Sequence, residues 1–139
     1  MEKKTSIEFA LYRLDRAKQE QSTAELLYKE NKLLAANNRA YYSIFYAIRA
    51  ILAMDKIDFK RHKDVLAYFN KNYVKTEIFP RQIGRKIVLA SKVREDSDYD
   101  EEYEPNPETT FLQIQTANEL IELVEKYLNN LQNKKSQIP

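Results

Sequence analysis

The chain of 139 residues contains one glycine, Gly84, and this scarcity restricts its fold more than any other feature. Tight hairpins and phosphate-binding loops need glycine where φ is positive, and the four prolines cannot replace it there. The length is that of one domain with a hydrophobic core of its own. We therefore predict a single all-α domain.

Apolar residues recur at three- and four-residue spacing in five segments, and no segment alternates convincingly as a strand would. The pattern predicts helices over residues 7–30, 33–54, 65–75, 80–99 and 107–131. Pro80 suits a first helical position, and Asn106 suits the cap before the last helix. Short connections favour an up-and-down antiparallel bundle. We expect one domain over residues 1–133 and a frayed tail over 134–139.

The second of these segments is rich in tyrosine and should be the central helix of the bundle. Its apolar residues leave small, uncharged alanines over most of the remaining circumference. It also brings Asn38, two arginines and three tyrosines into the bundle, and buried polar atoms need partners. A polar network or site is therefore expected nearby. The apolar residues are Tyr41, Ile44, Phe45, Ile48, Ile51 and Leu52.

Two further patterns concern the last two helices. Gly84 lies inside the fourth, where glycine costs about 1 kcal/mol against alanine, so it is either simply tolerated or marks the close approach of a neighbouring helix. The fifth helix should turn one stripe toward the core. That stripe consists of Phe111, Ile114, Asn118, Ile121, Val124, Leu128 and Leu131.

Charge is segregated along the chain although the formal net charge is only +2. Residues 56–94 hold eleven Lys or Arg against three acids, and residues 95–108 hold eight acids and no base. This pattern indicates either a solvated basic face followed by an acidic loop, or a basic groove for phosphate or an acidic partner. The candidate basic patch for nucleic acid consists of Lys60, Arg61, Lys63, Arg81 and Arg85.

The inventory of reactive side chains excludes most catalytic devices. There is no cysteine, and His62 is the only histidine, so thiolate and two-histidine metal sites are excluded and no cofactor is expected. No apolar run approaches the roughly 20 residues that cross a bilayer, and the N-terminus carries no secretory pattern. We expect a soluble, cytoplasmic protein.

Arg94 follows Ile87 by seven residues, close to two helical turns, and so falls on the core-facing stripe of the fourth helix. A buried guanidinium needs a partner. Asp98, one turn further on, would supply it in an internal pair, whereas a polar site between the second and fourth helices would offer a ligand instead. His62 is either the start of the third helix or a catalytic base.

Four blocks of sequence together resemble the small HEPN-domain proteins. They are Asn38-Arg39-Ala40-Tyr41-Tyr42, Lys60-Arg61-His62, Phe69 with the stretch 74–80, and Arg94-Glu95-Asp96-Ser97-Asp98-Tyr99. Their order and spacing cover roughly residues 10–130. The resemblance implies a four-helix up-and-down bundle with an additional short helix. It also implies a homodimer and a toxin–antitoxin-like pairing with a minimal nucleotidyltransferase.

Many HEPN proteins are metal-independent ribonucleases whose motif is an arginine followed, after four to six residues, by a histidine. Arg94 matches the arginine, but Asp98 and Tyr99 stand where the histidine belongs. This departure argues against ribonuclease activity and favours a dimeric protein that binds its partner, nucleotide or RNA. The binding residues would be Asn38, Arg39, Tyr42, Arg94, Asp98 and Tyr99. The alternative is an active metal-independent endoribonuclease that uses Arg94 with His62.

Overall fold

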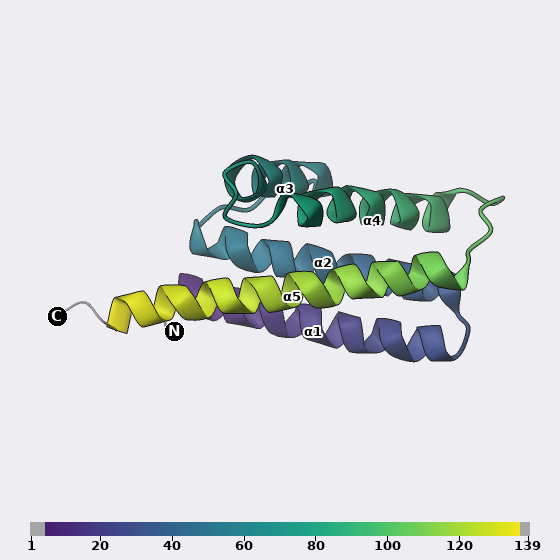
Figure 1. Ribbon diagram of the computed structural model, residues 1–139, viewed down its shortest axis with the longest axis horizontal. Coiled ribbons are helices and arrows are strands. Elements are labelled where there is room, and N and C mark those ends of the chain that lie inside the picture. The colour runs from purple at the N-terminus through teal and green to yellow at the C-terminus, as the bar shows by residue number, and fades with distance from the viewer. Residues whose placement is uncertain (1–4, 137–139) are drawn as a thin grey trace.

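The computed structural model describes residues 5–136 and contains five α-helices with no strand among them (Figure 1). This confirms the all-α prediction. A π-helix, η1, continues the third α-helix directly. The elements are α1 (Ser6–Lys29), α2 (Leu33–Met54), α3 (His62–Phe69), η1 (Asn70–Val74), α4 (Arg81–Tyr99) and α5 (Pro107–Ser136).

The four long helices run alternately in opposite directions, and α3 lies beside the start of α4 at one end of the bundle (Figure 1). In the chain, α3 and η1 connect α2 to α4. Helix α2 packs against α1, α3, α4 and α5, whereas α1 and α4 do not contact each other within the described chain. Helices α1 and α4 therefore flank α2 on two sides. This position confirms that the tyrosine-rich helix is central.

The core of the bundle is built around α2. All six apolar residues of its predicted stripe are buried, and Ile48 is 0% exposed. One narrow strip of α2 stays half-buried between α1 and α4. We call this strip the outer stripe of α2. It consists of Asn38, Arg39, Tyr42, Tyr46 and Arg49.

The predicted start of α5 is confirmed, whereas the predicted start of α4 is wrong by one residue. The Thr109 N–H donates to the Asn106 side-chain oxygen at 2.8 Å, so Asn106 caps α5 as expected. Pro80, expected at the first helical position, is instead the cap of α4, because its ψ of 144° is extended. At the C-terminus α5 continues through Ser136, into the stretch expected to be a frayed tail. Residues 137–139 lie outside the described range.

The face of α5 that meets the core follows most of the predicted stripe, because Ile114, Ile121, Val124 and Leu128 are buried, but it departs from the stripe at Phe111. Phe111 is 47% exposed, and its ring instead packs at the edge of the bundle, 6.2 Å from that of Tyr28. Thr110 and Gln113 take its place in the interior. These polar residues are tolerated there because their side chains donate to the carbonyls of Asn106 at 3.3 Å and Ala90 at 3.0 Å.

Gly84 marks the close approach of a neighbouring element. A Cβ atom at this position would lie 2.8 Å from Cγ1 of Val74 in η1. Simple tolerance of glycine is therefore not the explanation. The missing side chain lets the π-helical turn pack directly on α4.

Candidate functional site

A chain of polar contacts crosses the outer stripe of α2, starting on α1. The Glu20 carboxylate accepts a hydrogen bond from Arg39 at 3.0 Å and forms an ion pair with Arg16 at 3.7 Å. Arg39 also donates to the side-chain oxygen of Asn38 at 3.2 Å from Nε. Its guanidinium lies 5.0 Å from the centre of the Tyr42 ring, which places a planar cation on an aromatic face.

The same chain continues to α4 through Asp98. The Asn38 amide donates to Asp98 at 2.8 Å, and Arg94 Nε lies 3.0 Å from the same carboxylate oxygen. Arg94 Nε makes no hydrogen bond within the described chain, so this second contact is an ion pair only. Arg94 Nη2 donates to the Tyr42 hydroxyl at 3.3 Å. The expected Arg94–Asp98 pair thus forms, and it belongs to a network that joins α1, α2 and α4.

Aromatic rings enclose the Arg94 guanidinium. Its central carbon lies 5.3 Å from the Tyr41 ring, 5.6 Å from Tyr42 and 5.6 Å from Tyr99. Burial lowers the pKa of Arg94, but the neighbouring tyrosines and Asp98 outweigh it and raise the pKa overall. With 17% of its side chain exposed, Arg94 is a firmly held cation.

His62 begins α3 and also borders this network, so its two expected roles do not exclude each other. Its ring stacks on Phe45 with centroids 4.0 Å apart, and Nδ1 lies 3.1 Å from the Tyr41 hydroxyl. The Tyr41 and Tyr42 rings that contact Arg94 lie 5.9 and 5.8 Å from the imidazole. His62 and Arg94 therefore border the same two tyrosines, a proximity that the sequence left open.

The electrostatic surroundings of His62 favour the neutral imidazole. Burial lowers its pKa, and the positive charges of Arg94 and Arg49 lower it further. Burial also raises the pKa of Tyr41 to about 12, so that hydroxyl keeps its proton at neutral pH. When Tyr41 donates this proton to Nδ1, the one lone pair of the neutral ring is engaged.

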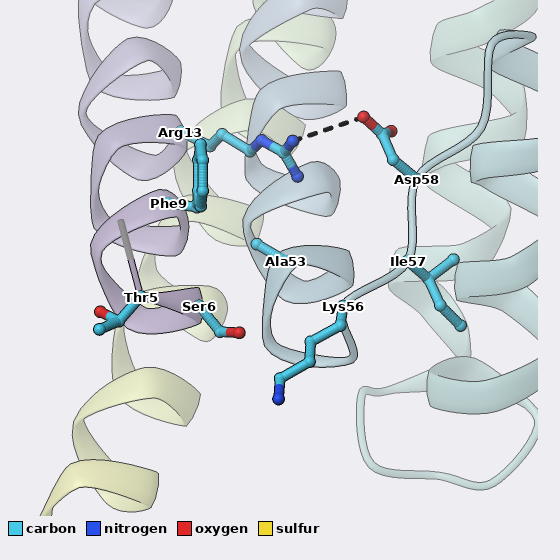
Figure 2. A pocket seen from close by; sticks show the side chains of 8 residues that line it. All are labelled: Thr5, Ser6, Phe9, Arg13, Ala53, Lys56, Ile57 and Asp58. Atoms are coloured by element: carbon cyan, nitrogen blue, oxygen red, sulfur yellow. Dashed lines mark hydrogen bonds and ion pairs between the residues drawn. The ribbon is translucent and has the colours of Figure 1, made fainter. Parts of the chain in front are cut away.

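A second polar cluster lies further along α2 and beside a cavity of about 540 Å³ (Figure 2). Asp58 binds Arg49 at 2.7 Å and Arg13 at 3.4 Å, and Arg13 also donates to the Arg49 carbonyl at 2.9 Å. Burial raises the pKa of Asp58, but the hydrogen bonds from Arg49 and the Phe59 N–H, with the two arginine charges, lower it overall. The cluster ties the 55–61 connection to α1 and α2.

Sequence reasoning missed the contribution of α1. Arg13, Arg16 and Glu20 recur at three- and four-residue spacing, which places them on one side of α1. That spacing was the available signal, but only the packing of α1 on α2 shows that this side meets the outer stripe.

The remaining predicted residues lie at or beyond the edge of this network. Tyr99 is 73% exposed. Arg61 and Arg81 pair with the nearby Asp64 at 3.0 Å and Glu77 at 3.2 Å, and none of the five basic-patch residues joins the network within the described chain. The cavity beside Arg94, of about 480 Å³, is lined by three carboxylates as well as Arg94 and Tyr99. The negative charges of these carboxylates, which belong to Glu95, Asp96 and Asp100, repel phosphate.

Residues 5–136 contain neither a candidate metal site nor a candidate membrane-spanning helix. No group of three His, Asp or Glu side chains in this range is placed to hold a metal ion. None of the described helices is long and apolar enough to cross a membrane.

Comparison with known proteins decides the family. The model of the HEPN domain matches residues 10–133 of this chain. The chain belongs to the HEPN-domain family. This HEPN protein is 33% identical over 116 residues to a UPF0332 protein of Thermotoga maritima, covering 84% of this chain and 88% of that one.

Two archaeal relatives carry a functional name. Both are proteins of Methanocaldococcus jannaschii named "Putative toxin", and both are 29% identical to this HEPN protein, over 115 and 116 residues. The matches cover 83% of this chain in each case and 78% and 85% of the relatives. The resemblance drawn from the four sequence blocks is thus confirmed at the level of the family.

The lowered pKa of His62 predicts a pH-dependent stability. Between its folded-state pKa and the ordinary value of about 6.5, the unfolded chain binds more protons than the folded one, so stability falls as the pH drops through this window. We expect the free energy of unfolding to fall between pH 7 and pH 5. His62→Phe, which keeps a ring on Phe45, should lose this part of the dependence. Urea denaturation at both pH values measures the difference, and identical pH profiles for the two proteins would contradict it.

Proposed function

We propose that this HEPN protein is the dimeric, toxin-like member of a pair with a minimal nucleotidyltransferase, and that it binds RNA along the outer stripe of α2. The observation that carries the proposal is the continuous chain of Arg16, Glu20, Arg39, Asn38, Asp98 and Arg94 across three helices. The names of the two archaeal relatives support the toxin-like role.

The chemistry of this stripe suits RNA. Arg39 and Arg49 of the stripe, and Arg16 beside it on α1, each keep between 26% and 38% of the side chain exposed, while acids and aromatic rings fix their orientation. A guanidinium fork binds phosphate oxygens, and adjacent aromatic rings offer surfaces on which bases stack. Tyr42 and Tyr46 are the half-buried rings of the stripe. The alternation of cations and rings therefore matches a single strand better than a rigid duplex.

Several features argue for binding without cleavage. Arg94 is committed to Tyr42 and Asp98, and the histidine of the family motif is absent. A neutral His62 has one lone pair, and in the tautomer that accepts from Tyr41 this lone pair is occupied. A general base needs that lone pair to take a proton from a 2′-hydroxyl.

An active endoribonuclease is the second candidate, and the closeness of His62 to Arg94 favours it. Both residues border Tyr41 and Tyr42. In such an enzyme Arg94 would stabilise the charged phosphate while His62 accepts the 2′-hydroxyl proton through the other tautomer. Incubating the purified protein with RNA and a chelator tests this. We expect no cleavage; cleavage that disappears in both His62→Ala and Arg94→Ala would establish the second candidate instead.

The binding proposal is tested by two arginine variants with the same loss of charge. Arg39→Ala removes a member of the polar chain, and Arg61→Ala removes an arginine that is 67% exposed outside it. We expect Arg39→Ala to weaken binding of a fluorescent single-stranded RNA by about tenfold, as one charge-assisted contact allows. The slope of log affinity against log salt should also fall by about 0.7.

The control variant decides where RNA binds. Arg61→Ala should stay within about twofold of the wild type, because exposed cations away from the strand contribute little. If Arg61→Ala weakened RNA binding more than Arg39→Ala did, the RNA would instead bind at the predicted basic patch. Affinity that does not change with salt would indicate a protein partner on this surface in place of RNA.

A further inference from the structure

The outward side of α4 carries a regular seam of exposed residues. Its positions alternate in spacing between four and three, which places all of them on one face of the helix. Helix α4 turns its opposite side, with Ile83, Ile87 and Ala90, into the core. The seam consists of Arg81, Arg85, Val88, Lys92, Glu95 and Tyr99.

No other helix of the described chain covers this seam. Val88 is 69% exposed and Tyr99 is 73% exposed, although both are large side chains. Leu89, beside the seam, is 64% exposed and lines a groove with Leu112 of α5, which is 61% exposed. Apolar side chains gathered in this way favour a partner that removes them from water.

The charges of the seam are complementary to the same seam running in the opposite direction. When two copies of α4 pair antiparallel about position 90, Arg85 faces Glu95, Arg81 faces Tyr99, and Val88 faces the aliphatic stem of Lys92. Arg85 and Glu95 take part in none of the ion pairs within the described chain, although Arg81 and Lys92 do. A parallel arrangement would instead place Arg85 on Arg85 and Glu95 on Glu95.

We propose that a second copy of this chain packs antiparallel on the α4 seam, with the two-fold axis near position 90. This inference rests on the dimer of the proposed function and names the surface through which the two copies pair. Two-fold symmetry makes each contact twice, so the axis relates two Arg85–Glu95 pairs and two Arg81–Tyr99 contacts.

The arrangement also completes the acid-lined cavity beside Arg94. Glu95 and Tyr99 belong both to the seam and to that cavity. The antiparallel second copy would therefore bring its own Arg81 and Arg85 to the mouth of the cavity, next to Asp96 and Asp100. Each copy would supply cations beside the carboxylates of the other, of which only Asp96 has an ion-pair partner within the described chain, and both cavities would lie at the interface.

Charge reversal with rescue tests the pairing. We expect Arg85→Glu and Glu95→Arg each to raise the dissociation constant of the dimer roughly tenfold or more, because each change places two like-charged pairs at the axis. The double variant with both changes should return to within about threefold of the wild type. Lys71→Glu, an equal charge change at an exposed residue of η1, should leave the constant unchanged. Analytical ultracentrifugation measures all four proteins against the wild type.

Engineered cysteines give a second measurement that needs no charge change. Because the chain has no cysteine, Val88→Cys and Lys92→Cys each introduce a unique thiol. Mixed under mild oxidation, the two variants should form a disulfide-linked heterodimer faster than either forms a homodimer, since position 88 faces position 92.

The outcomes separate this inference from the proposed function. A wild type that stays monomeric at micromolar concentration overturns the dimer itself. A wild-type dimer that tolerates both reversals, with no preference for the mixed disulfide, overturns the seam and leaves the dimer standing. RNA binding is measured independently of both, so its loss or retention does not decide the seam.

Discussion

Ile48→Ala is expected to lower the free energy of unfolding by about 2–5 kcal/mol, the range for removing a large aliphatic side chain from a packed core. Ile48 is 0% exposed and lies in the middle of α2, which packs against every other α-helix. Phe45→Ala should fall in the same range, because Phe45 is 6% exposed and supports the stacked His62 ring. Urea denaturation of each variant measures the loss.

A control variant at an exposed helical position separates the loss of buried side-chain packing from the change in helix propensity. Leu26→Ala removes an equally large side chain from α1, but Leu26 is 61% exposed. Its substitution should change stability by no more than about 0.5 kcal/mol. If Ile48→Ala and Leu26→Ala behaved alike, α2 would not be the centre of the core.

Arg94→Ala is expected to lower the free energy of unfolding by about 1–3 kcal/mol, because it removes a charged hydrogen-bond donor from a partly buried network. Asp98 would keep only its bond from Asn38, and Tyr42 would lose its donor. The double variant Arg94→Ala with Asp98→Ala should recover much of the loss, since no carboxylate is then left without its cation.

The same variant also tests the site. If Arg94 holds RNA as well as the network, the single variant should lose RNA affinity, and the double variant should not regain it when stability returns. Arg94→Lys is the matched control, because it keeps the charge but lacks the fork that reaches Tyr42 and Asp98 together. A variant with unchanged stability and unchanged RNA binding would contradict both roles.

The fold was largely predictable because its determinants are local. Apolar spacing places α2 at residues 33–54, the same bounds that the structure has, and Asn106 marks the start of α5 by its capping chemistry alone. The first turns of α5 were not predictable in this way. Gln113 is buried with the carbonyl of Ala90 on α4 as its acceptor, and only the packed structure brings that partner close.

In the candidate site, too, the residues that a local sequence pattern marks were predictable, and the contacts between distant helices were not. Arg94 and Asp98 could be singled out because they share one helix with an apolar stripe, and Asn38 and Arg39 because they open a buried helix. The contribution of Glu20 and the closeness of His62 to Arg94 depend on contacts between helices distant in sequence. Helical periodicity shows which side of a helix is polar but not what that side will meet.

The contacts of α2 with every other α-helix have a consequence for how the molecule opens. Removing any one of α1, α3, α4 or α5 would uncover part of α2, so no subset of helices retains a closed interior. Amide protons in the middle of α2 can then exchange with solvent only when the whole domain unfolds, whereas those of the outer helices can exchange through local fraying. The helix that carries the outer stripe is thus the last part of the molecule to lose its structure, and the arginines on it keep their positions for as long as the chain is folded at all.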